Sequence, residues 1–341
     1  MKLLVVNAGS SSLKLAVFDA SLVQLAGARV ERIGSGGAAD HLEALREGLA
    51  AMGVAVGDLT AAAHRVVHGG AGLVRPARIS AEVLAGIEAC IPLAPLHNPA
   101  NLMGVRALAS LVPDLPQYAS FDTAFHAAVP EVAARYALPP AAEALGLRRY
   151  GFHGISYASL VGRLRAKGAL PRRLLALHLG NGASLCAILD GQSVATTMGY
   201  SPLSGLTMGT RSGDIDGNAV LRLAEVHGVE GAARILNRES GLLGLGGASD
   251  MRALHAAGTE SAEFALEHFA YWAVRHAGSM VAAMGGLDAL AFTGGIGEND
   301  NWMRGRIVTG LAFLGAVPVH MVQAEEERQI AAEALAVMSL A

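Results

Sequence analysis

The chain has 341 residues, of which 52% are hydrophobic and 16% charged, and its formal net charge at pH 7 is -3. This length allows two or three domains, and the apolar content excludes an intrinsically disordered chain. Because the chain has no basic surplus to neutralise phosphates, we expect no nucleic-acid partner.

The cysteines and the apolar stretches give no sign of export or of a membrane. Cys90 and Cys186 form neither a CxxC nor a zinc-finger pattern, and they indicate no disulfide framework. The stretch Leu3–Val6 is too short for a signal-peptide core, and Ala277–Leu287 falls short of the ~18 residues that a spanning helix needs. We therefore expect a cytoplasmic protein without a membrane partner.

Strand and helix patterns alternate along the chain, which indicates an α/β fold. In chain order we expect a β-hairpin at Leu3–Asp19, a helix at Ala39–Met52, a strand at Ala61–His68, helices at Ala81–Cys90 and Asn101–Leu111, a strand at Gln117–Ser120, a helix at Ser156–Lys167, a hairpin at Leu174–Asp190 whose first strand is Leu174–His178, helices at Asn218–His227, Glu230–Glu239 and Ser261–Met284, a strand at Ala289–Thr293 and a helix at Glu325–Leu340.

The two expected hairpins resemble each other. An ungapped offset of 171 residues, half the chain length, aligns Leu3–Asp19 with Leu174–Asp190. Gly9 then pairs with Gly180, and Asp19 with Asp190. Short apolar–glycine–apolar patterns also recur by chance, but the matched spacing favours a duplicated domain with one hairpin in each half.

The first hairpin tip is suited to phosphate. The tip Asn7–Ser12 is rich in hydroxyls and backbone amides, and Lys14 adds a positive charge on an apolar strand. An ordinary turn is the alternative, although the chain keeps only three lysines, Lys2, Lys14 and Lys167. In the second tip, Gly180 and Gly182 would let a ligand approach the backbone closely, which on its own is a weak signal.

A third glycine-rich turn, Phe292–Asn299, follows a strand and precedes an expected helix, as nucleotide sites do. It lacks the third glycine of a dinucleotide fingerprint, and GxxxxGK[ST] occurs nowhere in the chain. In the loop Thr207–Asp216, Arg211 is suited to clamping a carboxylate or a phosphoryl group; a structural Arg–Asp pair is the alternative.

The segment His64–Gly70 closes a strand. Alternation places Arg65 and Val67 on one face, where the charge and the apolar side chain would suit a short carboxylic acid. On a helix, His64 and His68 would instead form a metal pair, but no HExxH accompanies them. Polar residues also occur among apolar neighbours in two further segments, Phe121–His126 and Tyr150–Gly154. Neither segment, taken alone, indicates a catalytic role.

Together these motifs resemble the acetate kinase family (acetate and propionate kinases) of the sugar kinase–actin–Hsp70 superfamily. The resemblance runs in order from Lys2 to about Ala331 and is carried by NAGSSSLK, HRVVHGG, PLAPLHNP, FDTAFH, YGFHG, HLGNGAS, MGYSPLSGLTMGTRSGDID and FTGGIGEN. Three features depart from the family: a shorter segment between Asp19 and His64, Ile155-Ser156-Tyr157 in place of Thr-Ser-His, and Ala324-Glu325-Glu326-Glu327 in place of Thr-Asn-Glu-Glu.

The resemblance implies a role for each matching residue. It implies catalytic roles for Asp122 (the essential acidic residue), His153 (transition-state stabilisation), Arg211 (the phosphoryl clamp) and Arg65 (the carboxylate clamp); an acyl pocket of Arg65, Val67, Leu96, Phe152 and Pro202; nucleotide contacts from Lys14, His178, Gly180, Asn181, Gly182, Asp250, Met251, Arg252, Gly295, Ile296, Gly297, Glu298 and Asn299; and a magnesium site of Asn7 and Glu326. Mn²⁺ is the alternative ion, and Glu325 and Glu327 are alternatives to Glu326.

The implied fold is α/β, a duplicated actin-like (ribonuclease H-like) fold of two domains with an interdomain cleft. Domain I is expected at 1–148 plus 325–341, and domain II at 149–324. The implied enzyme is a homodimeric transferase that uses ATP to phosphorylate acetate, giving acetyl phosphate and ADP by direct in-line transfer. A propionate or butyrate kinase is the alternative within the family. A non-catalytic nucleotide-binding module of the actin/Hsp70 type is the alternative from another class.

Overall fold

A computed structural model describes residues 1–340 of the protein. At Glu143 the description is confined to the backbone. Contacts divide the chain into two compact units. Unit 1 comprises residues 1–127, 154–159 and the described part of the tail from 325, and unit 2 comprises 128–153 and 160–324. Residues 128–148, expected in domain I, thus make their contacts within unit 2, and the boundaries proposed for the actin-like domains stay a prediction.

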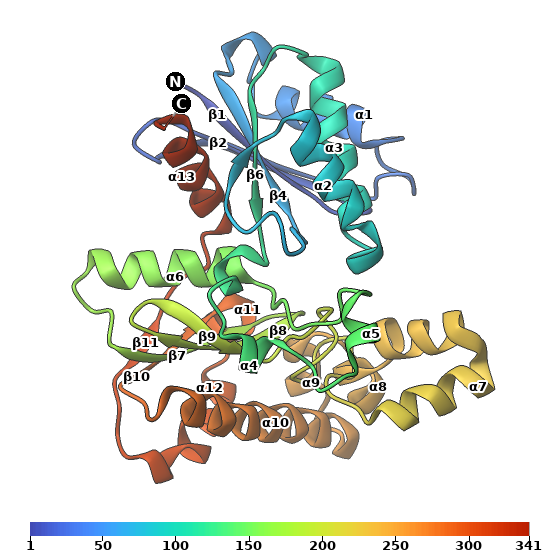
Figure 1. The fold of residues 1–341 in the computed structure, drawn as a ribbon, viewed down its shortest axis with the longest axis vertical. Helices are drawn as coiled ribbons and strands as arrows, with labels where there is room; N and C mark the ends of the chain where they lie inside the picture. Colours follow the sequence, from blue (N-terminus) through green and yellow to red (C-terminus); the bar gives the residue numbers. More distant parts are fainter. Residues whose placement is uncertain (341) are drawn as a thin grey trace. The chain divides into compact units, whose positions relative to one another are not determined.

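Unit 1 is built on a six-stranded sheet (Figure 1). Its order is β3-β2-β1-β4-β6-β5, in which β1–β3 form an antiparallel meander and β4 and β6 continue parallel to β1. The strands are β1 (Leu3–Ala8), β2 (Ser12–Phe18), β3 (Gln24–Glu31), β4 (Ala61–Val66), β5 (Ala77–Arg78) and β6 (Gln117–Phe121).

Helices bury both faces of this sheet, so the first four residues of β1, Leu3–Val6, are all apolar instead of alternating with polar residues. Leu4 and Val6 pack in a core with Leu108 of α3, whereas Leu3 and Val5 pack in another with Ile330 of α13. The helices of the unit are α1 (His41–Ala51), α2 (Ala81–Ala89), α3 (Asn98–Leu111) and α13 (Glu326–Met338), with short 3₁₀ turns at Val56–Asp58, Ile91–Leu93 and Ala124–His126.

Among its described residues, unit 2 repeats the order β3-β2-β1-β4-β6 and has no counterpart of β5. Its sheet runs β11-β10-β7-β8-β9, with an antiparallel meander β7–β9 and with β10 and β11 parallel to β7. The strands are β7 (Arg173–Leu179), β8 (Ala183–Leu189), β9 (Gln192–Thr196), β10 (Ala289–Thr293) and β11 (Val319–Met321). In both meanders the register shifts at a matching point, Val17/Phe18 and Ala187/Ile188.

Long helices accompany the second sheet (Figure 1). α10 contacts β7, β8 and β9, begins after the Thr259 cap and ends at Gly285 in the left-handed conformation. The helices are α4 (Glu131–Ala134), α5 (Pro140–Glu143), α6 (Gly154–Ala166, which begins in unit 1), α7 (Gly217–Arg234), α8 (Gly241–Gly246), α9 (Met251–Ala257), α10 (Glu260–Met284), α11 (Gly294–Asn299) and α12 (Asn301–Gly310), with a π turn at Ile235–Glu239 and a 3₁₀ turn at Ala312–Leu314.

The predicted elements are largely present, with two corrections. The strand expected at Ala61–His68 ends at Val66. The two helices expected at 218–239 are confirmed: a non-helical Gly228 (φ 72°, ψ 167°) separates two helical segments within α7, and the π turn follows the second. The expected repeat is confirmed in topology, but the tip Gly9–Ser12 is one residue longer than the tip Gly180–Gly182.

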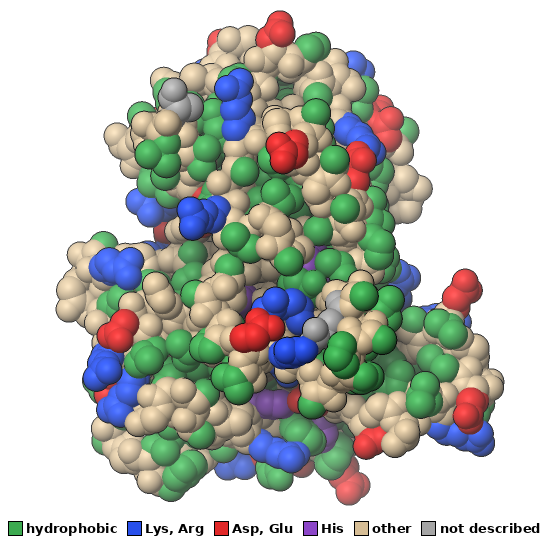
Figure 2. All heavy atoms as spheres, in the orientation of Figure 1, with side chains coloured by type: hydrophobic (Ala, Val, Ile, Leu, Met, Phe, Trp, Pro, Cys, Tyr) green, Lys and Arg blue, Asp and Glu red, His purple; other side chains and the backbone are tan. Residues whose placement is uncertain are grey.

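The surface fits the near-neutral charge of the chain. On the face that Figure 2 shows, basic and acidic side chains are interspersed, without a broad patch of one sign. Among residues 1–340, none of the helices has the length and apolarity needed to cross a membrane.

Candidate active site

In unit 1, polar side chains gather where β1, β4 and β6 end. These strands run in parallel, so their carboxyl ends meet at one edge of the sheet, which is where α/β sheets bind ligands. Asn7 comes near the end of β1, Arg65 near the end of β4, and Asp122 directly after β6. The sheet topology therefore brings together three residues that the sequence separates.

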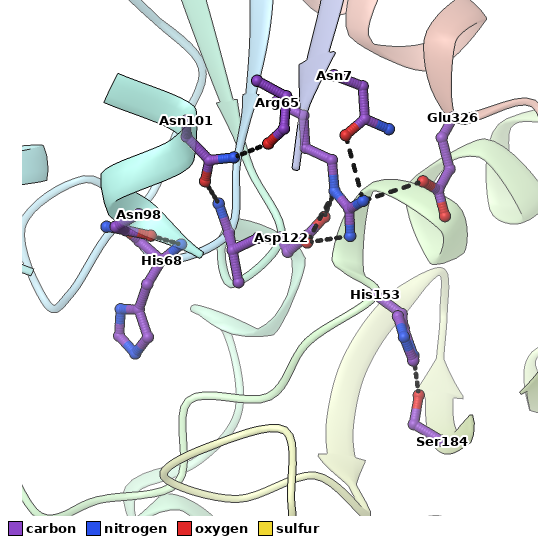
Figure 3. Close-up of polar contacts among 11 residues, drawn as sticks. Asn7, Arg65, His68, Asn98, Asn101, Asp122, His153, Ser184 and Glu326 are labelled. Carbon is purple, nitrogen blue, oxygen red and sulfur yellow. Dashed lines mark hydrogen bonds and ion pairs between the residues drawn. The ribbon is translucent and has the colours of Figure 1, made fainter. Parts of the chain in front are cut away.

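Arg65 is the centre of this group (Figure 3). Its Nη2 and Nε donate to Oδ2 of Asp122 over 2.7 and 3.0 Å, and its Nη1 lies 3.5 Å from Oδ1 of Asn7 and 3.9 Å from Oε2 of Glu326. Asp122 is buried, with 2% of its surface exposed. Arg65 thus has one edge fixed by a carboxylate and Nη1 close to two further oxygens.

The burial of this group perturbs its charges. Burial raises the pKa of the Asp122 carboxyl above its ordinary value, and the opposing charge of Arg65 limits that rise. Burial alone would lower the pKa of Arg65, but Asp122 and Glu326 raise it, so the guanidinium stays charged. Perturbed groups of this kind, at the carboxyl ends of parallel strands, are typical of functional sites.

Two buried asparagines of α3 position the segment that follows Arg65 (Figure 3). Oδ1 of Asn101 accepts from the backbone N–H of Val67, and its Nδ2 donates to the carbonyl of Ala8. Asn98 pairs in the same way with both backbone groups of His68. The sequence analysis missed both roles, although these residues lie at i and i+3 and so share one face of the helix.

The three glutamates before and within α13 differ in their surroundings. Glu326 faces Arg65, whereas Oε1 of Glu327 lies 2.8 Å from Nζ of Lys14. Glu325 precedes the helix and lies 4.0 Å from Arg328. Glu326 therefore approaches the cluster around Arg65 through an ion pair.

The donors at this edge are compatible with a divalent cation. Asn7, Asp122 and Glu326 offer oxygen atoms around one guanidinium, and hard cations such as Mg²⁺ prefer oxygen ligands. Within the described part of the chain, no three His, Cys, Asp or Glu side chains converge as a metal site. A cation here would therefore need the amide oxygen of Asn7 as well as carboxylates.

In unit 2, two histidines and one arginine converge on the second hairpin tip. The rings of His153 and His178 are stacked with centroids 4.1 Å apart, and Nδ1 of His153 lies 2.9 Å from Oγ of Ser184 (Figure 3). A Cβ added at Gly182 would lie 3.2 Å from Nε2 of His153 and 3.3 Å from Nη2 of Arg211. Glycine at this position therefore leaves room between two cationic or proton-donating groups.

Both of these side chains are held firmly. His153 adopts the left-handed conformation (φ 60°, ψ 20°), a strained geometry for a residue with a side chain. Nη1 of Arg211 donates to the carbonyl of Pro202 over 2.7 Å. Burial lowers the pKa of the Arg211 guanidinium, which favours pairing with an anion.

The same hairpin tip borders a cavity of about 1020 Å³ in unit 2. The cavity is lined by three predicted nucleotide segments: the tip at Gly180 and Asn181, the start of α9, and the turn that forms α11. The predicted residues among its lining are Gly180, Asn181, Asp250, Met251, Arg252, Gly295, Ile296 and Asn299. The remaining lining includes His255, Asp300 and Trp302, which the sequence analysis missed.

Glu298 has a different environment from the other residues of its turn. Its Oε1 accepts from the backbone N–H of Gly294 over 3.1 Å and from that of Ala324 over 2.8 Å. The carboxylate thus joins the glycine-rich turn to the segment just before the glutamates of α13. A nucleotide contact of Glu298 itself stays a prediction.

The residues expected in an acyl pocket divide between the units. Val67 is buried in unit 1, where Leu96 is 49% exposed, whereas Phe152 and Pro202 belong to unit 2. Val67 follows the end of β4, so strand alternation does not place it on the face of Arg65. The pocket stays a prediction that rests on the family resemblance.

Comparisons with known proteins agree with these features. Residues 2–334 match the model of the Acetokinase family. The chain is 42% identical to an acetate kinase of Pseudarthrobacter chlorophenolicus, over 99% of each chain, and 45% identical to acetate kinase 1 of Neisseria meningitidis serogroup A, over 92% of this chain and 86% of the other.

Two solved structures are also similar. The acetate kinase of Porphyromonas gingivalis has a TM-score of 0.92 at 35% identity over 99% of both chains. A propionate kinase of Francisella tularensis has a TM-score of 0.91 at 35% identity, over 97% of this chain and 98% of the other. With the order of five strands that the two sheets share, these similarities confirm the predicted duplicated actin-like α/β fold.

Proposed function

The chain belongs to the acetokinase family, and we propose that it transfers the γ-phosphoryl group of ATP reversibly to acetate, giving acetyl phosphate and ADP. One observation carries this proposal. The tip Gly180–Gly182 borders the large cavity of unit 2 at Gly180 and Asn181 and, at Gly182, lies against Arg211 and His153. A nucleotide in the cavity would therefore direct its phosphates toward the two side chains best suited to neutralise them.

Phosphoryl transfer of this kind depends mainly on positioning and on charge neutralisation. Arg211 would bind the equatorial oxygens of the transferred group from its fixed position against Pro202. His153, aligned by Ser184 and by stacking on His178, would donate a hydrogen bond to the same group. The transfer is in line and needs no covalent enzyme intermediate.

Arg65 would hold the carboxylate of the acceptor. Asp122 occupies one edge of the guanidinium. Nη1 makes only longer contacts, to Asn7 and Glu326, so it is the nitrogen that would bind the carboxylate of the acceptor. Asn98 and Asn101 hold the chain that leads from Arg65 to Val67 and His68. Val67, Leu96, Phe152 and Pro202 are proposed to surround the alkyl end of the acid.

We assign the divalent metal of this kinase as Mg²⁺, with Mn²⁺ as the alternative. Asn7 and Glu326 would hold the ion, since their oxygens lie on either side of one nitrogen of Arg65. When bound, the ion supplies positive charge to the phosphate oxygens of ATP. Lys14, paired with Glu327, would contribute a further charge near the same edge of unit 1.

The preferred acid is the part of the proposal most open to test, because the similar structures include a propionate kinase. Hydroxylamine trapping of acyl phosphate should be run with acetate, propionate and butyrate, each with ATP and Mg²⁺. Acetate should give the highest kcat/KM. A higher value for propionate or butyrate would reassign the acid, and no acyl phosphate with any acid would favour the non-catalytic nucleotide-binding module.

We further propose a cytoplasmic homodimer. Light scattering during size-exclusion chromatography should give about twice the 34.9 kDa mass of the chain.

Arg211→Ala provides the matched control for the activity assay, since it removes the phosphoryl clamp. It should lower kcat by on the order of 10²–10⁴ while the KM values change less.

A further inference from the structure

One end of the cavity in unit 2 carries an aromatic side chain that the roles assigned so far do not use. Trp302, in the first turn of α12, lines this cavity and is 40% exposed. The hairpin tip that borders the phosphate-neutralising residues also lines the cavity, through Gly180 and Asn181. The cavity thus offers polar backbone at the tip and a large exposed ring on α12.

Neighbouring side chains hold the ring of Trp302 in place. His255 of α9 packs perpendicular to it, with centroids 5.3 Å apart and planes at 77°. The guanidinium of Arg306 lies 5.9 Å from the ring centroid, within cation–π range, and is itself paired with Glu267. A surface tryptophan without a role would not need contacts from a second helix.

His255 is anchored in turn. Its Nε2 lies 2.9 Å from Oδ2 of Asp300, whose Oδ1 caps α12 by accepting from the backbone N–H of Met303. The start of α12, and with it Trp302, is therefore tied to α9, which also lines the cavity. Met251, Ala256 and Ile296 add apolar surface to the same lining.

We propose that Trp302 is the wall on which the base of the nucleotide stacks, with His255 as a positioning residue, and that it gives the enzyme a preference for purine over pyrimidine nucleotides. This inference rests on the proposed function, because it takes the cavity to be the nucleotide site. Stacking uses the flat face of a base, and the larger purine ring system covers more of an indole than a pyrimidine does.

The first experiment uses Trp302 as its own reporter. The chain has two tryptophans, Trp272 and Trp302, and Trp272 lines a different pocket beside His268. With tryptophan excited selectively over tyrosine, Trp302 is the only tryptophan that reports in Trp272→Phe. There ADP should change the emission saturably, and tripolyphosphate, which has no base, should not. In Trp302→Leu, where Trp272 is the remaining tryptophan, ADP should leave the emission unchanged.

The second experiment measures specificity. Trp302→Leu should raise the KM for ATP on the order of tenfold, the effect expected from loss of one stacked base, with kcat and the KM for acetate within about twofold of wild type. The ratio of kcat/KM for ATP to that for CTP should fall about fivefold or more. Trp302→Phe, which keeps a flat ring, should recover most of both effects. Phe264→Leu, which removes an exposed ring of α10, is the control.

The outcomes separate the two proposals. If calorimetry detects ADP binding and acetyl phosphate is formed, but Trp302 emission and the ATP-to-CTP ratio do not change, the base lies elsewhere and this inference is wrong. If ADP quenches Trp302 but no acyl phosphate forms, the stacking role stands and the proposed reaction fails. Should Trp302→Leu not fold, the reporter experiment on Trp272→Phe still decides the point.

Discussion

Arg65 donates to the carboxylate of Asp122 through two nitrogens, and the acceptor carboxylate is almost completely buried. Arg65→Ala leaves the buried Asp122 carboxylate without its counter-charge and should lower the free energy of unfolding by about 3–5 kcal/mol. Asp122→Ala should cost less, because the Arg65 side chain is 23% exposed and keeps Glu326 at 3.9 Å. The double variant should cost clearly less than the sum, with a coupling of about 1.5 kcal/mol or more in urea unfolding. Additive losses would mean that the two side chains act independently.

Gly182 is predicted to be required for its lack of a side chain. A Cβ there would lie 3.2 Å from His153 and 3.3 Å from Arg211, closer than ordinary contact, so Gly182→Ala should push both side chains from their positions. We expect kcat to fall about 10- to 100-fold, as small displacements at a reacting centre do, with the melting temperature nearly unchanged. Gly305→Ala, where a Cβ meets nothing, is the matched control and should keep full activity.

The left-handed backbone of His153 predicts a difference between two inactive variants. Both His153→Gly and His153→Ala lose the hydrogen bond to Ser184 and the stacking on His178. Glycine adopts a φ of 60° without strain, so the glycine variant should be about 1 kcal/mol more stable than the alanine variant. Equal stability in thermal unfolding would show that this backbone relaxes once the imidazole is gone.

Glu326 and Glu327 should differ in their effect on the metal requirement. Glu326 lies beside Arg65 and Asn7, whereas Glu327 is paired with Lys14. Titrating activity with Mg²⁺ should show a strongly raised requirement for Glu326→Ala and little change for Glu325→Ala. Glu327→Ala should chiefly alter the KM for ATP through Lys14. If Glu325→Ala or Glu327→Ala shows the metal effect instead, the ligand must be reassigned.

His64 should make the protein sensitive to acid. Burial lowers its pKa from 6.5 to about 4, so between these values the unfolded chain binds more protons than the native one. The contribution of neutral His64 is therefore complete above pH 6.5 and is lost progressively as the pH falls toward 4, by roughly 3 kcal/mol in total. His64→Gln should flatten the stability profile in this window, measured by urea unfolding at several pH values. An unchanged slope would assign the acid sensitivity to other groups.

The elements that the sequence predicted correctly have strong local patterns. β1, β4, β7 and β10 are mainly apolar and buried, because both faces of their sheets are covered, and their polar residues lie chiefly toward the strand ends. The edge strand β3 was missed because its exposed residues interrupt the apolar pattern, and α11 because it consists largely of glycine. The break at Gly228 within α7 was visible in the sequence as a gap between two helical patterns.

In the candidate site, too, the sequence predicted some residues and missed others. Motifs identified Arg65, Asp122, His153 and Arg211 because each lies in a distinctive short segment. They could not reveal Asn101, whose partner Ala8 lies 93 residues away, or the left-handed backbone that places His153 beside Ser184. Trp302 is a partly exposed residue at the start of α12, and only its place in the lining of the cavity gives it a role.

The shorter tip of the second hairpin changes which residues correspond between the two halves. Asn7 lies opposite Lys14 in the first hairpin, and His178 lies opposite Ser184 in the second. The ungapped alignment would match Lys14 with Leu185, but the strand pairing matches it with Ser184. After an ancestral duplication, the loss or gain of one residue in the tip would have shifted the pairing of the two strands by one residue without changing the fold. The two copies have thus diverged at one shared position: one holds an amide and an ammonium, the other an imidazole and the hydroxyl that aligns His153.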